Sequence, residues 1–454
     1  MFYRKAVLFA VAGLLASRGL ALADTTPKTH LSLDPTVITA AEEAAAADRA
    51  PLMMALDKIG TAKPLDDLKL NIYGWLETGY SYNHRHHGQE TEIVPGPFNH
   101  EVGNHFMLNQ FDLRFERLAD TKTFDVGGLV EVVYGTDAGF MHSSGLGFGG
   151  NDPTDDGVPF DAVPDKYRAN YQFDLVQAYV DVNLPVGNGL TLRLGKFVTL
   201  LGNETCDPRG NAFYSHSWAF NAVPFSQTGV LGIYQLNEQW KITAGITRGW
   251  DMTLEDTNGA IDGLGNIAYT PNDQFSVVFN WSVGPQNSGD TSHYRTALDP
   301  IINWQVTKEF KLAAEALYIY DGGVNTEDAA DGVTHAYGDA WGLVLYGSYT
   351  LNDYLTLNGR AEKFHSYMDP FYALGRTMSD TSALNVAGES ASTINIYSFT
   401  LGVTVTPMPK DALLKNLSIR PEIRYDFSED PVFTQHGSTF KDQITFAADV
   451  IFKF

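Results

Sequence analysis

The chain ends in the stretch Gln443–Phe454, QITFAADVIFKF, in which apolar residues occupy every second position. The apolar set is Ile444, Phe446, Ala448, Val450, Phe452 and Phe454. Side chains on a strand point alternately to its two faces, so the other face carries Asp449 and Lys453. Such a strand is an aggregation hazard at the edge of a soluble sheet, but a strand that closes a barrel in lipid needs this pattern. The ending therefore predicts a transmembrane β-barrel.

The amino terminus predicts export. Arg4 and Lys5 form a basic region, residues 6–16 are a short apolar core, and Ala21–Ala23 is an A-x-A cleavage site. The apolar core is too short to span a membrane. We therefore expect residues 1–23 to be a signal peptide, with Arg18 placed late in it.

Composition narrows the class of protein. Cleavage removes three basic residues and takes the formal net charge from -23 to -26, which argues against nucleic-acid binding because phosphate neutralisation needs a basic surface. No run of about eighteen apolar residues occurs, which excludes a helical membrane protein. Cys206 is the single cysteine, so no intrachain disulfide forms despite export. A chain with 42 Gly, 27 Phe and 22 Tyr has the composition of an outer-membrane barrel, although a secreted β-sandwich shares most of it.

Residues 24–67 read as a periplasmic segment with a helix. An Ala- and Glu-rich run begins at Thr39 and continues to Gly60, and Thr39 with Glu42 fits a capping box. Pro64 is expected to close it. We interpret the segment as a periplasmic lead, with folding into the lumen or a role in assembly as the alternative.

From residue 68 to the end, alternating stretches predict a barrel of about sixteen antiparallel strands. They are 68–82, 111–116, 124–134, 176–184, 190–194, 229–236, 239–250, 264–271, 274–284, 296–307, 309–321, 339–351, 353–366, 393–406, 416–427 and 442–454. The stretch at 264–271 is short, and Pro421 interrupts another strand, where it costs a ladder hydrogen bond. Fourteen or eighteen strands therefore stay open.

The connections alternate between tight turns and long loops. The long ones are 83–105, 136–169, 200–227, 251–263, 285–295, 322–338, 367–392 and 428–441. This parity is typical of the periplasmic and extracellular ends of a membrane barrel, and a soluble sandwich has no reason for it. An even strand count also leaves both termini in the periplasm.

The face opposite the apolar stripe is charged. An Arg or Lys at the lipid midplane costs ~2–4 kcal/mol, so these groups must face inward. A barrel of this width leaves an aqueous channel, which predicts passage of small hydrophilic solutes. We expect some of the charges to pair across neighbouring strands, among them Arg360 with Glu362 and the group Arg420, Glu422, Arg424 and Asp426.

The third long loop, residues 200–227, is the expected constriction. Its aromatic residues are suited to packing on the inner wall, and its charged residues to lining a narrowed opening that sets ion preference. The alternative is a loop that covers the barrel mouth for stability alone. The predicted pore-lining and constriction residues are Arg114, Glu131, Arg193, Lys196, Glu204, Asp207, Arg209, His216, Arg360, Glu362, Arg420, Glu422, Arg424 and Asp449.

This loop and its neighbours resemble the OmpL-like β-barrel porin-2 family. The Gly-Lys-Phe of residues 195–197 together with the Tyr-Ser-His-Ser of residues 214–217 carries the resemblance most specifically. Residues 132–137, 245–251 and 417–426 add to it, and it covers about residue 70 to Phe454. The resemblance implies an outer-membrane porin without an assigned substrate.

Other candidate sites are weaker. His84, His86 and His87 lie close in sequence and are possible transition-metal ligands, but no carboxylate or cysteine is near them. Acidic groups around Gly157 and at residues 256–259 lack the complete pattern of a calcium loop. A barrel hydrolase is a minor hypothesis, because Ser215, His216 and Ser217 are sequence neighbours whose side chains point apart on an extended segment.

Taken together, the sequence predicts an outer-membrane diffusion porin without enzymatic activity or cofactor. The alternative is a channel selective for a sugar, an anion or a metal-bearing nutrient. The expected partners are outer-membrane lipid and lipopolysaccharide, and two further copies of the chain in a homotrimer. We also expect the barrel-assembly machinery to read the terminal Phe454.

Overall fold

The computed structural model describes residues 49–84, 103–146, 171–326, 334–367, 393–435 and 438–454. Two short helices, α2 (Pro51–Lys58) and α3 (Ala62–Asp67), precede the first strand. Pro51 opens α2 at a position where the missing N–H costs no hydrogen bond. No helix among the described residues is long and apolar enough to cross a membrane.

The boundaries of these helices correct two sequence predictions. The predicted helical run to Gly60 is not continuous, because Arg49 and Ala50 are not helical and α2 begins at Pro51. The chain turns between α2 and α3 at Gly60, whose φ of +76° favours glycine. Pro64 lies inside α3 rather than closing the helical segment. It sits in the first turn, where a missing backbone N–H is tolerated. Thr39 and Glu42, the predicted capping box, lie outside the described residues.

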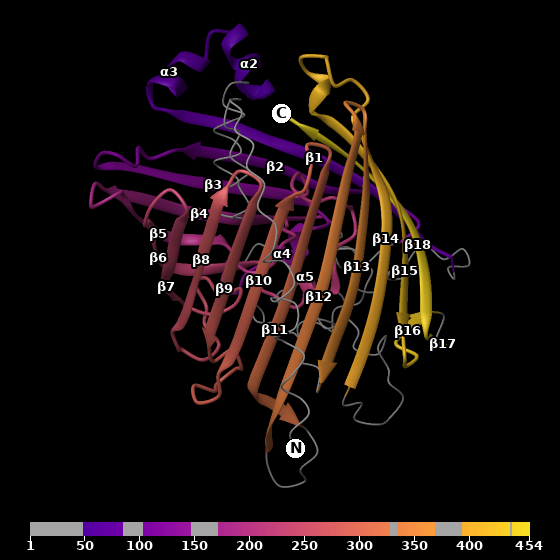
Figure 1. Cartoon of the computed structure of the whole chain (residues 1–454). Helices are drawn as coiled ribbons and strands as arrows, with labels where there is room; N and C mark the ends of the chain where they lie inside the picture. The colour runs from indigo at the N-terminus through magenta and orange to yellow at the C-terminus, as the bar shows by residue number, and fades with distance from the viewer. Residues whose placement is uncertain (1–48, 85–102, 147–170, 327–333, 368–392, 436–437) are drawn as a thin grey trace.

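Sixteen strands form one closed antiparallel barrel, which confirms the predicted all-β transmembrane fold (Figure 1). The barrel strands are β1 (Leu70–Asn83), β2 (Phe106–Arg117), β3 (Asp125–Gly135), β4 (Gln172–Leu184), β5 (Leu190–Val198), β6 (Ser226–Gln235), β7 (Trp240–Thr247), β8 (Asp262–Asn272), β9 (Phe275–Gly284), β10 (Arg295–Gln305), β11 (Phe310–Thr326), β12 (Thr334–Asn352), β13 (Leu355–Tyr367), β14 (Thr393–Val405), β15 (Leu417–Ser428) and β18 (Asp442–Lys453). Pro421 lies within β15, which stays in continuous register with β18.

The first and last strands close the barrel. β1 pairs with β18 from Trp75 opposite Lys453 to Asn83 opposite Thr445. Closure leaves no strand edge unpaired, as a barrel in lipid requires. On β18, Phe446 is 47% exposed and faces outward, whereas Asp449 is 1% exposed and faces inward. The two faces read from the terminal stretch are thus the outer and inner faces of the barrel.

Most connections sort by length as predicted, but the predicted long loop 322–338 is wrong. The ladder between β11 and β12 continues to Thr326 and Thr334, so only residues 327–333 lie between these two strands. Residues 118–124, 185–189, 236–239, 273–274, 306–309, 353–354 and 406–416 form the shorter connections at one end, the last containing the short helix η4 (Leu414–Asn416). The long loops lie at the other end, which the loop-length rule makes extracellular. One of them contains α4 (Ala138–Met141), and the last contains a small hairpin of β16 (Phe433–Gln435) and β17 (Ser438–Phe440) that the sequence did not predict.

Candidate functional site

The segment between β5 and β6, residues 199–225, lies inside the barrel, and we call it loop 3. It contains the short helix α5 (Trp218–Asn221), seen within the barrel in Figure 1. Trp218 and Val223 of loop 3 share one buried apolar cluster with Val344 and Phe364 of the wall. The aromatic residues of loop 3 therefore hold it against the strands rather than in solvent.

Wall carboxylates accept the backbone N–H groups of loop 3. Glu362 on β13 accepts two at the start of α5, and Glu422 on β15 accepts two just before it. The donors are Trp218 (2.9 Å) and Ala219 (2.8 Å) for Glu362, and Tyr214 (2.9 Å) and Ser215 (3.1 Å) for Glu422. Asp299 on β10 accepts a further N–H, from Gly202 at 2.8 Å. Charge-assisted bonds of this kind are about twice as strong as neutral ones, so they fix the loop in place.

Wall arginines donate to the carbonyl groups of the same loop. Arg360 donates to Ser215 O at 2.8 Å, Arg420 to Pro208 O at 2.9 Å, and Arg424 to His216 O. Each guanidinium also binds a carboxylate; the partners are Glu204, Asp449 and Asp426, respectively. The buried charges of the wall and the polar backbone of the loop thus satisfy one another.

This arrangement differs from the predicted pairing along the strands. Arg360 and Glu362 were expected to pair, but each binds loop 3 instead. Arg420 pairs with Asp449 and Glu77 on the two strands of the barrel seam. The predicted pairing within β15 is limited to Arg424 with Asp426, at 2.9 Å.

Two glycines allow loop 3 to approach the wall closely. A Cβ at Gly79 would lie 2.3 Å from the ring of Tyr214, and a Cβ at Gly342 would lie 2.9 Å from the side chain of Ala219. The Tyr214 hydroxyl then reaches Asn109 Oδ1 at 3.1 Å. Side chains at these glycines would displace the loop toward the channel.

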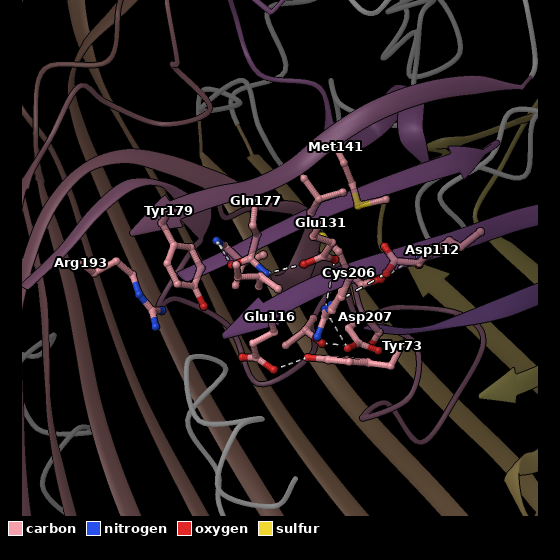
Figure 2. A pocket seen from close by; sticks show the side chains of 16 residues that line it. Tyr73, Asp112, Glu116, Glu131, Met141, Gln177, Tyr179, Arg193, Cys206 and Asp207 are labelled. Carbon is pink, nitrogen blue, oxygen red and sulfur yellow. Dashed lines mark hydrogen bonds and ion pairs between the residues drawn. The ribbon is translucent and has the colours of Figure 1, made fainter. Parts of the chain in front are cut away.

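A second group of charges surrounds a cavity of about 40 Å³ between loop 3 and strands β1 to β5 (Figure 2). Asp207 of the loop binds Arg209 at 2.7 Å and Arg114 of β2 at 3.1 Å. Arg114 also binds Glu131 of β3 at 3.1 Å. The Arg209 guanidinium lies 4.3 Å from the ring centre of Trp75, a cation–π distance. Loop 3 is therefore also joined to the wall on this side.

Charged groups of loop 3 are electrostatically matched to their surroundings. Burial opposes ionisation of Glu204, but Arg360 and His216 outweigh it and hold the pKa of this carboxyl below its usual value. Burial likewise opposes ionisation of Asp207, and Arg209 and Arg114 lower its pKa in the same way. Both carboxylates therefore stay ionised at neutral pH.

His216 stays neutral at neutral pH, unlike the two ionised carboxylates, and this predicts how stability changes with pH. Burial lowers the pKa of His216 to about 4, although the Glu204 carboxylate favours the charged ring. His216 binds a proton near pH 6.5 in the unfolded chain but only near pH 4 in the folded chain. The neutral ring therefore stabilises the fold fully above pH 6.5, and this stabilisation is lost as pH falls from 6.5 to 4. We expect the contribution of His216 to the free energy of unfolding to fall by about 3 kcal/mol between these limits. Thermal unfolding from pH 8 to 4 measures it.

The matched variant is His216→Gln, which keeps a polar planar side chain without the titrating ring. Its melting temperature should change less than that of the wild type between pH 6.5 and 4. The pKa of Glu204 is lowered from 4.5 in the folded chain, so loss of its contribution begins only as pH falls through about 4.5, where the unfolded chain binds the proton. Equal pH dependence of the two proteins over the histidine window would mean that His216 does not titrate as inferred.

The sequence from residue 69 to residue 454 matches a family described as "Putative beta-barrel porin-2, OmpL-like". The chain belongs to this porin family. It is therefore a channel-forming barrel of the outer membrane. No curated protein matches the chain.

Solved structures of other porins share the fold. The outer membrane channel DcaP of Acinetobacter baumannii is 14% identical, with a TM-score of 0.50 over 85% of this chain and 97% of that one. OmpF of Salmonella typhi, solved as a complex with daunomycin, is 12% identical, with a TM-score of 0.51 over 86% and 99% of the two chains. At such identities the likeness concerns the barrel alone.

Arg193 and Lys196 have partners on β4, and Arg193 also lines the cavity of Figure 2 together with Asp207 of loop 3. Arg193 on β5 binds Asp181 at 2.9 Å and lies 3.8 Å from the ring centre of Tyr179. Lys196, also on β5, donates to Leu175 O at 2.6 Å and pairs with Asp174 at 3.4 Å. The other predicted residues contact loop 3, belong to it, or bind a residue that contacts it.

Sequence reasoning missed several polar residues that hold loop 3. Asp299, Asn109 and Gln110 all bind it, the last through a bond from Gln110 Nε2 to Cys206 O of 2.9 Å. Glu77 joins the group through Arg420. Their inward position in the strand alternation was the available signal, because a buried polar residue in a wide barrel needs a partner.

The metal hypothesis gains no support within the described part of the porin. No group of three or more His, Cys, Asp or Glu side chains there is arranged to hold a metal ion. His84 accepts the Ile444 N–H at 3.0 Å through its Nδ1. His86, His87 and the acidic group around Gly157 lie outside the described residues. The Asp256 carboxylate caps its own turn, accepting the N–H groups of Asn258 and Gly259.

The hydrolase hypothesis rests on the Ser215–Ser217 motif, whose side chains have other partners. The Ser215 hydroxyl accepts from Arg360 at 2.9 Å, and the Ser217 hydroxyl caps α5 by accepting the Phe220 N–H at 3.1 Å. The His216 ring stacks on Phe220, with 4.1 Å between ring centres. The side chains of this motif therefore stabilise the conformation of loop 3.

Proposed function

We propose that the porin is a passive diffusion channel for ions and small hydrophilic solutes, narrowed by loop 3 and selective for cations over anions. The proposal rests on one observation, the charge of the buried interior. Among the described residues, 17 Asp and Glu side chains are buried, against seven Arg and Lys. An excess of one sign at a narrowing favours counterions of the other sign.

Planar-bilayer recording of the purified porin tests the proposal. We expect ohmic conductance steps and, in a KCl gradient, a zero-current potential of the sign that cation preference gives. Absence of conductance would exclude a channel, and a potential of the opposite sign would exclude cation preference. Raising the salt concentration should weaken the preference, because salt screens the charges.

Arg209 offers a test of loop 3 as the constriction. The Arg209 side chain is 13% exposed, whereas the Asp207 side chain is 6% exposed. A unit charge about 10 Å from an ion in water contributes about 0.4 kcal/mol, with opposite sign for a cation and an anion, so Arg209→Gln should raise the cation-to-anion permeability ratio roughly fourfold. The control is Lys308→Gln, which removes one positive charge from the turn between β10 and β11. Equal shifts in both variants would show that loop 3 does not set selectivity.

A substrate-selective channel is the second candidate, favoured by the cavity of Figure 2. This cavity combines aromatic rings, Tyr73 and Tyr179, with several carboxylates and guanidinium groups. Neither carboxylate oxygen of Asp112 has a hydrogen-bond partner among the described residues, so a bound polar solute has an acceptor there. Block of the ionic current by low concentrations of one sugar or cationic solute would favour this candidate over free diffusion.

Further features follow from the same proposal. We infer that the porin is a homotrimer without enzymatic activity, and that residues 1–23 and 24–67 are the signal peptide and a periplasmic lead. The barrel itself begins near residue 68. Lipopolysaccharide surrounds its extracellular half, and the assembly machinery binds Phe454. Size-exclusion chromatography with light scattering of the detergent-solubilised porin tests the trimer.

A further inference from the structure

The outer face of the barrel carries a basic side chain, Lys363 on β13. Its neighbours in the chain, Glu362 and Phe364, are 4% and 0% exposed and face the interior. The burial pattern of β13 alternates at every residue around them, so Lys363 faces the membrane. The lumen therefore does not contain all the charges of the strands.

The strand register gives the depth of Lys363. It lies opposite Leu343 of β12 and Tyr397 of β14, strands that run side by side in Figure 1. The next outward positions toward the short turns are apolar, namely Leu345, Ala361 and Phe399. The next ones toward the long loops are Trp341, His365 and Asn395. Lys363 thus lies where the apolar band meets the extracellular aromatic belt.

Aromatic rings orient the Lys363 ammonium without neutralising it. Its Nζ atom lies 5.2 Å from the ring centres of both Trp341 and Tyr397. Among the described residues, no carboxylate forms an ion pair with it. His365 stacks on Trp341 with 5.4 Å between ring centres, and its Nδ1 lies 3.0 Å from Asn395 Oδ1. Polar groups of two adjacent strands therefore surround one positive charge on a surface that is otherwise built for lipid.

Carboxylates lie on the extracellular side of this group. Asp339 lies opposite Tyr367, one outward position beyond Trp341. The Tyr397 hydroxyl donates to Glu429 at 3.4 Å, beyond the end of β15. An anion that reaches Lys363 therefore approaches it from the membrane side, below these carboxylates.

We propose that Lys363, supported by His365 and Asn395, binds a phosphate group of lipid A in the outer leaflet. The charge complements a phosphate, and lysine is a common phosphate ligand. The depth matches a headgroup at the membrane interface, where a lysine costs much less free energy than at the midplane. This site depends on the outer-membrane location of the barrel and not on its ion selectivity.

The test is native mass spectrometry of the detergent-solubilised porin with bisphosphorylated lipid A and with its dephosphorylated form. A basic residue near an anionic surface contributes about 1 kcal/mol, so Lys363→Met should reduce retention of the phosphorylated lipid about fivefold. The dephosphorylated lipid should bind weakly to both proteins. Single-channel conductance should match the wild type, since Lys363 faces away from the lumen, and this also verifies folding.

Lys308→Met is the matched control, because it removes the same charge from the opposite end of the barrel. It should retain lipid A like the wild type. Equal retention by Lys363→Met, or equal binding of the two lipids, overturns the proposal. Dissociation of an oligomer in Lys363→Met with lipid retention unchanged also overturns it, and assigns Lys363 to a contact between copies of the chain.

Discussion

The double variant Glu362→Ala, Glu422→Ala is expected to conduct at roughly twice the wild-type level, because loop 3 then leaves the wall and the narrowing widens. Four backbone N–H groups lose their acceptors in this variant. Hydrogen bonds to charged groups contribute ~1.5–3 kcal/mol each, so the loop loses about 6 kcal/mol or more of attachment. Arg360 and Arg424 also lose nearby negative charge, which weakens their hold on the loop carbonyls.

The barrel itself should survive these changes, because the strand ladders do not involve either side chain. Circular dichroism and heat-modifiable migration on gels verify this. The control pair Glu238→Ala, Glu309→Ala removes the same charge from two exposed turns and should conduct like the wild type. A folded double variant with unchanged conductance would show that loop 3 is not what narrows the channel.

Much of the barrel is predictable from sequence because strand alternation is local information. The stretch at 264–271 seemed too short for a barrel strand, yet β8 runs over Asp262–Asn272 because both ends continue the ladder with β9. Pro421 did not end β15, since the partner strand β18 stays in register past it. Barrel closure gives every strand two neighbours, and this constraint corrects weak local signals.

The contacts of loop 3 are much less predictable. Glu362 and Trp218 lie 144 residues apart in the chain, and only the fold brings them together. Spacing along a strand instead suggested that Arg360 and Glu362 would pair. A buried side chain binds whichever partner satisfies it best, and here the unpaired N–H groups of the loop are the stronger competitors. The outward position of Lys363 was not predictable from charge alone either. A charged residue on a strand can face the membrane when it lies near the membrane interface.

Substitution of the terminal residue, Phe454→Ala, is expected to reduce the amount of assembled porin in outer-membrane fractions by up to about tenfold. The Phe454 ring stacks on Phe111 at 5.8 Å between centres and lies 6.5 Å from Phe452. Aromatic pairs contribute ~0.5–1.5 kcal/mol, and the upper limit corresponds to a tenfold change in an equilibrium. Immunoblotting of heat-modifiable protein in membrane fractions measures the assembled form.

The backbone of Phe454 also closes the seam, exchanging two hydrogen bonds of 2.9 Å with Gly74. Alanine retains both bonds, whereas deletion of Phe454 removes them and leaves Gly74 with two unsatisfied groups at the rim. The structural and signalling roles therefore separate. If the ring is read by the assembly machinery, Phe454→Ala fails in cells but refolds in detergent as well as the wild type. If the Phe454 ring only packs the seam, the yield of refolded Phe454→Ala in detergent falls by the same factor as its assembly in cells.

The control for both assays is Phe446→Ala, which removes an aromatic ring from the same strand. Phe446 is 47% exposed on the outer face and lies opposite Tyr82. Removing it loses contact with lipid rather than hydrophobic burial from water, so its effect on refolding should be small. Equal assembly of Phe446→Ala and Phe454→Ala in cells would contradict a special role for the terminal ring. The alternating stripe of β18 would then matter as a whole, and its last residue only as one member of it.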